Sequence, residues 1–181
     1  MTHTKVISEK VTFKQENAFE IRQLEIEYPN KNRSTHFIAE RIPVVTVFPL
    51  TDTYDIYLIS QYRYLLRKTI LEAVSGKMDR PESALKTAER ELKEEAGIEA
   101  VQIEELANTQ LAGSFFKGTV HIFLAKGLTL GEPEPEEGEQ IELVKMPLSQ
   151  AVEKVFSGEI TTLSTIAGVL MLNQLRIEKK L

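Results

Sequence analysis

Short apolar runs and alternating segments in the first part of the chain predict strands. Leu24, Ile26 and Tyr28 alternate with charged residues, which is the period of a half-buried strand. Three further apolar runs have the length of short strands, at residues 44–48, 56–59 and 71–74. Because turn-forming residues 51–55 separate the first two of these runs, we expect a hairpin there.

The clearest helical period covers residues 83–96. Apolar residues recur four positions apart from Ala84 to Leu92, Ser83 suits the N-cap and Gly97 suits a left-handed C-cap. Strands are expected again at residues 106–111, 120–125 and 143–146, and two closing helices at residues 148–156 and 163–176. This order predicts an α/β (α+β) fold in which helices cover a mixed sheet.

Composition and charge narrow the classes of function. The 181 residues include 22 Lys and Arg against 27 Asp and Glu, a net charge of −5 that argues against a general nucleic-acid binder. The absence of cysteine excludes a disulfide scaffold, a thiolate metal site and a Cys nucleophile. The first residues hold no apolar run typical of a secretory signal, and residues 160–175 are too short and polar to span a bilayer, so we expect a cytoplasmic protein.

Carboxylates gather at the end of the central predicted helix, where they oppose its stability. Glu91 and Glu95 are four residues apart and share a face, at a cost of about 0.2–0.5 kcal/mol. Glu94 and Glu95 occupy the last turn, where the helix dipole favours cations. A divalent cation would remove this repulsion, and oxygen ligands suit Mg²⁺, with Mn²⁺ also possible. Arg90, four residues before Glu94, can hold that carboxylate in position. The alternative to a metal site is an acidic helix face that is only solvated.

The spacing of the surrounding residues favours the metal site over the solvated face. The turn at Gly76 can bring backbone carbonyls, that of Ser75 in particular, close to the same cation. Five residues separate Gly76 from Glu82, and seven more precede the run Arg-Glu-Leu-x-Glu-Glu-x-Gly-Ile, which begins at Arg90. The sequence thus matches the Nudix box at every specified position. A chance match in a chain of this length is on the order of one in ten million. The chain therefore resembles the Nudix hydrolases.

The resemblance covers roughly residues 35–175 and is greatest to members of the ADP-ribose pyrophosphatase type. It implies an α/β/α Nudix sandwich over residues 41–181 and Mg²⁺-dependent hydrolysis of a nucleoside diphosphate sugar, such as ADP-ribose to AMP and ribose 5-phosphate. Residues 1–40 are similar to the N-terminal antiparallel β arm of the dimeric nucleoside diphosphate sugar hydrolases. The resemblance thus implies a homodimer, in which this arm contributes to dimerisation or to the substrate pocket.

The same resemblance implies roles for the acidic residues. Glu91 and Glu95 match the principal metal ligands, and the carbonyl of Ser75 completes their cluster. Glu94 matches a further ligand or base. The acidic loop at residues 132–140 supplies two carboxylates that match a general base or another ligand, namely Glu137 and Glu139. Of these two, Glu137 is favoured as the base.

Substrate contacts are also implied by the resemblance, and the substrate itself stays open. The residues that match or could serve as substrate contacts are Arg63, Glu72, Arg41 and Arg33. Leu-Ala-Gly at residues 111–113 stands where the ADP-ribose subgroup usually has a proline, so GDP-mannose or another sugar nucleotide is an alternative. A Nudix-fold sensor that binds nucleotides without turnover is a further alternative. Residues 113–119 resemble a phosphate loop only in composition and are expected to form a turn between strands.

Overall fold

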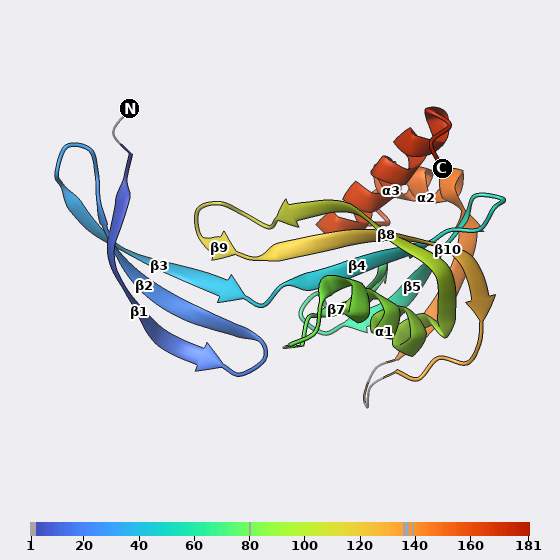
Figure 1. Ribbon diagram of the computed structural model, residues 1–181, viewed down its shortest axis with the longest axis horizontal. Helices are drawn as coiled ribbons and strands as arrows, with labels where there is room; N and C mark the ends of the chain where they lie inside the picture. Colours follow the sequence, from blue (N-terminus) through green and yellow to red (C-terminus); the bar gives the residue numbers. More distant parts are fainter. Residues whose placement is uncertain (1–2, 80, 136–137, 139) are drawn as a thin grey trace. The chain divides into compact units, whose positions relative to one another are not determined.

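The computed structural model describes residues 3–79, 81–135, 138 and 140–181 (Figure 1). The strands and helices are β1 (Lys5–Gln15), β2 (Phe19–Glu27), β3 (Arg33–Arg41), β4 (Val44–Pro49), β5 (Asp55–Arg63), β6 (Lys68–Glu72), β7 (Val74–Lys77), α1 (Ala84–Ala96), β8 (Ile98–Gln110), β9 (Phe116–Lys117), β10 (Thr119–Leu130), β11 (Ile141–Pro147), α2 (Leu148–Phe156) and α3 (Leu163–Ile177). The helices predicted from the sequence are confirmed, with a one-residue difference at the end of α3. None of the helices in the described part of the chain is long and apolar enough to cross a membrane.

The described residues form two compact units. The first consists of Met1–Pro43 and Thr109–Val120, and the second of Val44–Asn108 and His121–Leu181. Residues 109–120 therefore group with the N-terminal strands, although they lie within the range that the sequence assigns to the Nudix domain. The proposed roles of the N-terminal arm in dimerisation and in the substrate pocket stay predictions.

The first unit is a sheet in the order β1-β2-β3-β9. β1, β2 and β3 are antiparallel, as the sequence predicts for an N-terminal antiparallel arm. β9 pairs with β3 in parallel, with Ala39 opposite Phe116 and Glu40 opposite Lys117. The prediction that residues 113–119 form only a turn is therefore wrong, because a strand of two residues is too short to produce a periodic pattern.

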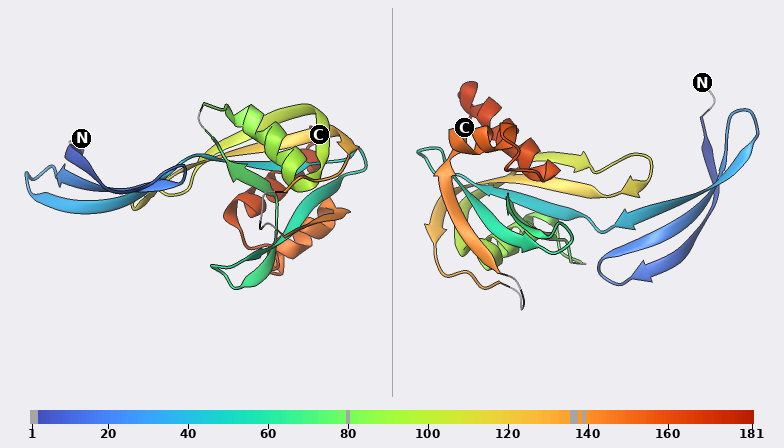
Figure 2. Two further views of the ribbon diagram at one scale, coloured as in Figure 1. Left: turned by 90° about the horizontal axis from the view of Figure 1, so that it is seen from below. Right: turned by 180° about the vertical axis from the view of Figure 1, so that it is seen from behind.

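The second unit contains two sheets, in the orders β7-β4-β10-β8 and β11-β5-β6. Figure 2 shows α1 on one side of its strands and α2 with α3 on the other, which confirms the α/β/α sandwich. The hairpin expected around residues 51–55 is wrong, because β4 and β5 belong to different sheets and share only an isolated bridge between Leu50 and Ile56. A turn signal shows that the chain reverses, but it does not show which strand each segment will pair with.

Apolar side chains from the strands and from one face of α1 form the core beside the candidate site. Its buried members are Val45, Val47, Tyr57, Ile59, Val74, Ala88, Leu92, Ala96, Ile98, Phe123 and Ala125. α1 begins after Ser83, whose hydroxyl accepts a hydrogen bond from the Lys86 amide, and ends at Gly97, which has a left-handed φ of 63°. This core fixes the rotation of α1, and therefore decides which of its charged residues turn inward.

Candidate functional site

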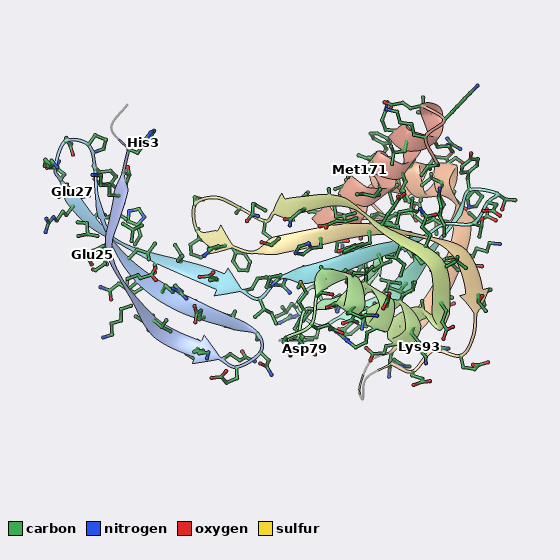
Figure 3. The ribbon with its side chains drawn as sticks, viewed as in Figure 1. His3, Glu25, Glu27, Asp79, Lys93 and Met171 are labelled. Atoms are coloured by element: carbon green, nitrogen blue, oxygen red, sulfur yellow. The ribbon has the colours of Figure 1, made fainter. Side chains whose placement is uncertain are left out.

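Two carboxylates of α1 lie on its inward face. Glu91 is 9% exposed and Glu95 is 4% exposed, and both lie beside the buried Ala88 and Leu92. The opposite face of α1 carries ordinary exposed charges such as Lys93, which Figure 3 labels. Burying carboxylates costs free energy unless they are paired or hydrogen-bonded. The inward face of α1 therefore carries charge at positions where stability alone would favour apolar residues.

Strand β7 provides the backbone on which both carboxylates rest. The amide of Ser75 donates a hydrogen bond of 2.8 Å to Oε2 of Glu95. The carboxylate of Glu91 packs against Gly76 so closely that a Cβ at Gly76 would overlap it. A side chain at position 76 would therefore displace the Glu91 carboxylate. The predicted participation of the Ser75 carbonyl in metal binding stays a prediction.

Arg90 is the centre of an ion-pair network beside these carboxylates. Its Nη1 lies 2.8 Å from Oε2 of Glu94 and 2.8 Å from Oε1 of Glu91. Nε and Nη2 each donate to Oε2 of Glu82 at 3.3 Å, and Nη2 also donates to the Lys77 carbonyl at 3.1 Å. The contact with Glu94 expected from their spacing is present. Because a guanidinium presents several donors in a fixed plane, one side chain holds three carboxylates in a defined arrangement.

Electrostatics keep Arg90 charged. Partial burial acts to lower the pKa of Arg90, but the charge of Glu91 and hydrogen bonds to Glu94, Glu82 and Glu91 outweigh it and raise this pKa above its ordinary value. Glu82 is further fixed by Thr87, whose hydroxyl donates to Oε2 at 2.9 Å. Arg90 is therefore a permanent counter-charge to the carboxylates around it.

A second charged pair lies on the neighbouring sheet of the same unit. Nε of Arg63 donates to Oε1 of Glu72 at 2.5 Å, and the Glu72 side chain is 8% exposed while that of Arg63 is 38% exposed. Glu72 on β6 lies opposite Ile59 on β5, and side chains two residues apart on a strand share a face. Gln61 therefore lies on the same face as Arg63 and Glu72. The guanidinium of Arg63 is the accessible member of this pair and could bind an anion.

Gln61 adds an unusual polar group to that face. It is 6% exposed, and its Oε1 has no hydrogen-bond partner within the described residues. A buried acceptor without a donor costs about 1–3 kcal/mol. The sequence analysis did not single out Gln61, because an alternating strand pattern alone marks it as one more inward position. Polar identity at an inward position was the signal that could have found it.

The donor set fits a hard divalent cation, although the described residues do not form a complete site. Glu91 and Glu95 offer oxygen atoms that are buried and supported by the backbone of β7, and such oxygens suit Mg²⁺. Among residues 3–79, 81–135, 138 and 140–181, no three acidic or histidine side chains are grouped so that they could hold a metal ion. Arg90 instead pairs with both Glu91 and Glu94.

The acidic loop is described only in part, and Glu137 and Glu139 lie outside the described residues. Its first residues are bonded to the end of α1. The Gly131 amide donates to the Gly97 carbonyl at 2.6 Å, and the Glu134 amide donates to the Glu94 carbonyl at 2.9 Å. The described start of the loop is therefore attached to the helix that carries Glu91 and Glu95.

Arg33 and Arg41 belong to the first unit. Nη2 of Arg33 lies 3.3 Å from Oε2 of Glu27, which Figure 3 labels on β2. A hydrogen bond from Lys31, together with Arg33, lowers the pKa of Glu27. Burial lowers the pKa of Arg41 at the end of β3. The proposed contacts of both arginines with substrate stay predictions.

The residues that sequence reasoning did not connect are Glu82 and Lys77. Glu82 was recognised only as a member of the box, and its contact with Arg90 comes from a position before the helix begins. Lys77 contributes its carbonyl, which no side-chain pattern can indicate. Glu82 lies eight residues before Arg90, just ahead of the first residue of the helix. This spacing could have indicated the contact between the two side chains.

Comparisons with known proteins identify the family of this chain. The family model described as NUDIX domain matches residues 40–163. The methanol dehydrogenase activator of Bacillus methanolicus is 31% identical over 168 residues, which cover 89% of this chain and 91% of the relative. The ADP-ribose pyrophosphatase of Bacillus subtilis (strain 168) is 31% identical over 147 residues, which cover 80% of each chain.

A solved structure extends the agreement to the fold. The crystal structure of an ADP compounds hydrolase matches 100% of this chain and 98% of that chain with a TM-score of 0.85, at 21% sequence identity. The family match covers more than half of the chain, and it includes Gly76 and the carboxylates of α1. This chain therefore belongs to the Nudix hydrolase family.

Proposed function

We propose that this Nudix protein hydrolyses the diphosphate bond of nucleoside diphosphate sugars, with ADP-ribose as the leading substrate. One water is consumed, and ADP-ribose yields AMP and ribose 5-phosphate. The observation that carries the proposal is the pair of buried carboxylates, Glu91 and Glu95, seated on the backbone of Ser75 and Gly76. Such a costly arrangement is expected where a cation must be held rather than where a helix must be stable.

Different residues are proposed to bind the metal, to position the acidic side chains and to act as the general base. Glu91, Glu95 and the carbonyl of Ser75 would hold Mg²⁺ or Mn²⁺, with Glu94 or Glu139 as a further ligand. The bound cation would lower the pKa of a water and neutralise phosphate charge. Arg90 orients the acidic residues, which is a positioning role. The general base is assigned to Glu137 first and Glu139 second.

Arg63 and Glu72 are proposed to bind the substrate itself. The guanidinium of Arg63 matches the geometry of phosphate oxygens, and its exposed part leaves donors for them. Glu72 orients Arg63 and could accept a hydrogen bond from a ribose hydroxyl.

The relatives support the class of substrate and also a second candidate. A relative of similar identity is named ADP-ribose pyrophosphatase, which supports that substrate. The relative that covers 89% of this chain is named methanol dehydrogenase activator, which supports a second candidate, regulation of a partner enzyme. A nucleotide sensor without turnover belongs to the same class. The buried carboxylates, which suit a metal ion, favour catalytic turnover over either a regulator or a sensor.

A substrate panel distinguishes these candidates. The protein is incubated with ADP-ribose, GDP-mannose and other sugar nucleotides in Mg²⁺ or Mn²⁺, and an added phosphatase releases inorganic phosphate from the products. We expect the highest kcat/KM with ADP-ribose. A higher kcat/KM with GDP-mannose would change the proposed substrate but leave the proposed diphosphate hydrolysis in place. Binding of these nucleotides without phosphate release in either metal would support the sensor and contradict the proposed hydrolysis.

Variants of α1 test which carboxylates matter. Glu91→Gln and Glu95→Gln are expected to lower kcat at least about 100-fold with Mg²⁺ saturating, because each removes a charged ligand at fixed shape. Glu89→Gln is the matched control, since Glu89 is exposed on the same helix and pairs with Lys86 at 2.6 Å. Turnover close to that of the unmodified protein in both buried-site variants would contradict the assignment.

The base is tested separately in the acidic loop. Loss of a general base lowers kcat by about 10²–10⁴-fold, whereas loss of a ligand weakens the apparent affinity for the metal. We expect Glu137→Gln to lower kcat across the pH range without changing the Mg²⁺ dependence. If Glu139→Gln alone behaves in this way, the roles of the two residues are exchanged.

A further inference from the structure

The two charged clusters of the second unit are joined by a very short piece of chain. β6 ends at Glu72 and β7 begins at Val74, and the two strands belong to different sheets. Ala73 is the only residue between them. Glu72 holds Arg63 on one side of this junction, and Ser75 and Gly76 support Glu95 and Glu91 on the other.

The backbone of the junction is held by a residue far away in the sequence. Ala73 has no place in the register of β6 with β5 or of β7 with β4, so its amide needs a partner elsewhere. This amide donates a hydrogen bond of 3.0 Å to Oγ1 of Thr165 in the first turn of α3. Ala73 and Thr165 are each 1% exposed, so water cannot replace this bond.

Thr165 is itself held firmly. The hydroxyl of Thr162 donates to Oγ1 of Thr165 at 2.8 Å. One turn further along α3, Gly168 packs so closely against Phe48 of β4 that a Cβ there would overlap the ring. Val169 and Leu172 are completely buried on the same helix. α3 is therefore seated on the sheet in one position, and Thr165 transmits that position to Ala73.

We propose that Thr165 is a positioning residue that sets the spacing between the substrate-binding pair, Arg63 with Glu72, and the metal-binding carboxylates, Glu91 with Glu95. The inference rests on the proposed function, because it requires both clusters to act on one diphosphate. Each cluster has its own internal contacts, so Thr165 governs their alignment and not the formation of either one.

Kinetics of full-length variants test this role. Thr165→Val keeps the shape but removes the acceptor, so we expect kcat to fall about 10- to 100-fold through misalignment. KM and the affinity for Mn²⁺ should change less than about threefold, because each cluster still binds its own part. Thr165→Ser keeps the hydroxyl and should restore kcat to within about threefold. Thr162→Val is the control, since it removes a donor to Thr165 and leaves the bond to Ala73.

Several kinetic outcomes would overturn the proposal. They are an unchanged kcat in Thr165→Val, a loss confined to KM or to Mn²⁺ affinity, and a failure of Thr165→Ser to restore turnover. If Thr165→Val does not fold, Thr165→Cys takes its place, because a thiol of similar size is only a weak acceptor. An intermediate kcat is then expected, and full activity would contradict the role.

A readout without turnover separates this inference from the proposed function. In ¹⁵N spectra of the full-length protein, Thr165→Val should shift the amide signals of Ala73 and Ser75 and the Nε–H signal of Arg63, because both clusters move relative to the junction. A shift limited to Ala73 would overturn the inference. If the unmodified protein cleaves no sugar nucleotide, the proposed function fails, while these shifts still decide whether Thr165 links the two clusters.

Discussion

Gly76 packs directly against the carboxylate of Glu91, so the arrangement of the site depends on the absence of a side chain at this position. We predict that Gly76→Ala lowers kcat by about 100-fold, because the added methyl group displaces Glu91 from its place on β7. Steady-state hydrolysis over a range of Mn²⁺ concentrations measures the effect. Gly113→Ala is the control, because a Cβ at Gly113 meets no atom within 4 Å. Equal loss in both variants would contradict the role of close packing.

Arg90 illustrates what an arginine does that a lysine cannot. It contacts Glu82, Glu91 and Glu94 together, and an ammonium group cannot reproduce this planar set of donors. We predict that Arg90→Lys lowers the free energy of unfolding by about 1–3 kcal/mol in urea without divalent ions. Arg67→Lys, at an exposed position, should change it by less than about 0.5 kcal/mol. Equal stability of the two variants would count against the network.

The sequence predicted part of this site because some of its contacts are local. Four-residue spacing on a helix predicts that Arg90 reaches Glu94, and the structure has that contact at 2.8 Å. The contact of Thr165 with Ala73 spans 92 residues and depends on how α3 packs against the sheet. No spacing rule contains that information, since tertiary packing alone brings the two residues together.

At the scale of elements, the end of α1 is both a helix cap and an attachment point for the acidic loop. Gly97 has φ 63°, and a Cβ there would lie 2.6 Å from the Gly131 carbonyl oxygen. We predict that Gly97→Ala lowers the free energy of unfolding by at least about 2 kcal/mol, because the cost of a left-handed φ and the cost of a steric clash are added together. Thermal or urea unfolding measures this change.

Gly158 offers a control that isolates the steric part. It has φ 79° and a Cβ there would meet no atom within 4 Å, so Gly158→Ala should cost only about 1 kcal/mol. The difference between the two variants then measures the contact between the end of α1 and residues 131–133. Equal costs would show that the loop yields easily and is not attached at Gly97.

Helices were predicted better than strands for a physical reason. Caps such as Ser83 and Gly97 mark where a helix starts and stops within its own sequence. The apolar run at residues 71–74 was expected to be one strand, but it divides at Ala73 between two sheets. Strand partners are chosen by contacts distant in sequence, so a continuous apolar run does not reveal where the chain changes sheets.

At the scale of the whole molecule, the first unit exposes apolar side chains that a monomer would leave in water. Phe13 is 53% exposed and Phe37 is 55% exposed. They lie opposite Ile21 and Gln23, which are two residues apart on β2, so both aromatic rings share one face of the sheet. Exposed apolar patches of this kind mark interaction surfaces, and the homodimer expected from the sequence makes a second copy of the chain the partner to test.

This surface gives a test of the oligomeric state. We predict that the full-length chain sediments as a dimer and that Phe37→Lys shifts it to a monomer with an unchanged circular dichroism spectrum, because a charge at the centre of an apolar interface is left unpaired. Phe156→Lys is the control, since Phe156 is 78% exposed on α2, in the second unit. A monomeric unmodified protein, or a Phe37→Lys variant that stays dimeric, would contradict the assignment of this face to dimerisation. A monomer that retains full turnover would further show that the catalytic site is complete within one chain.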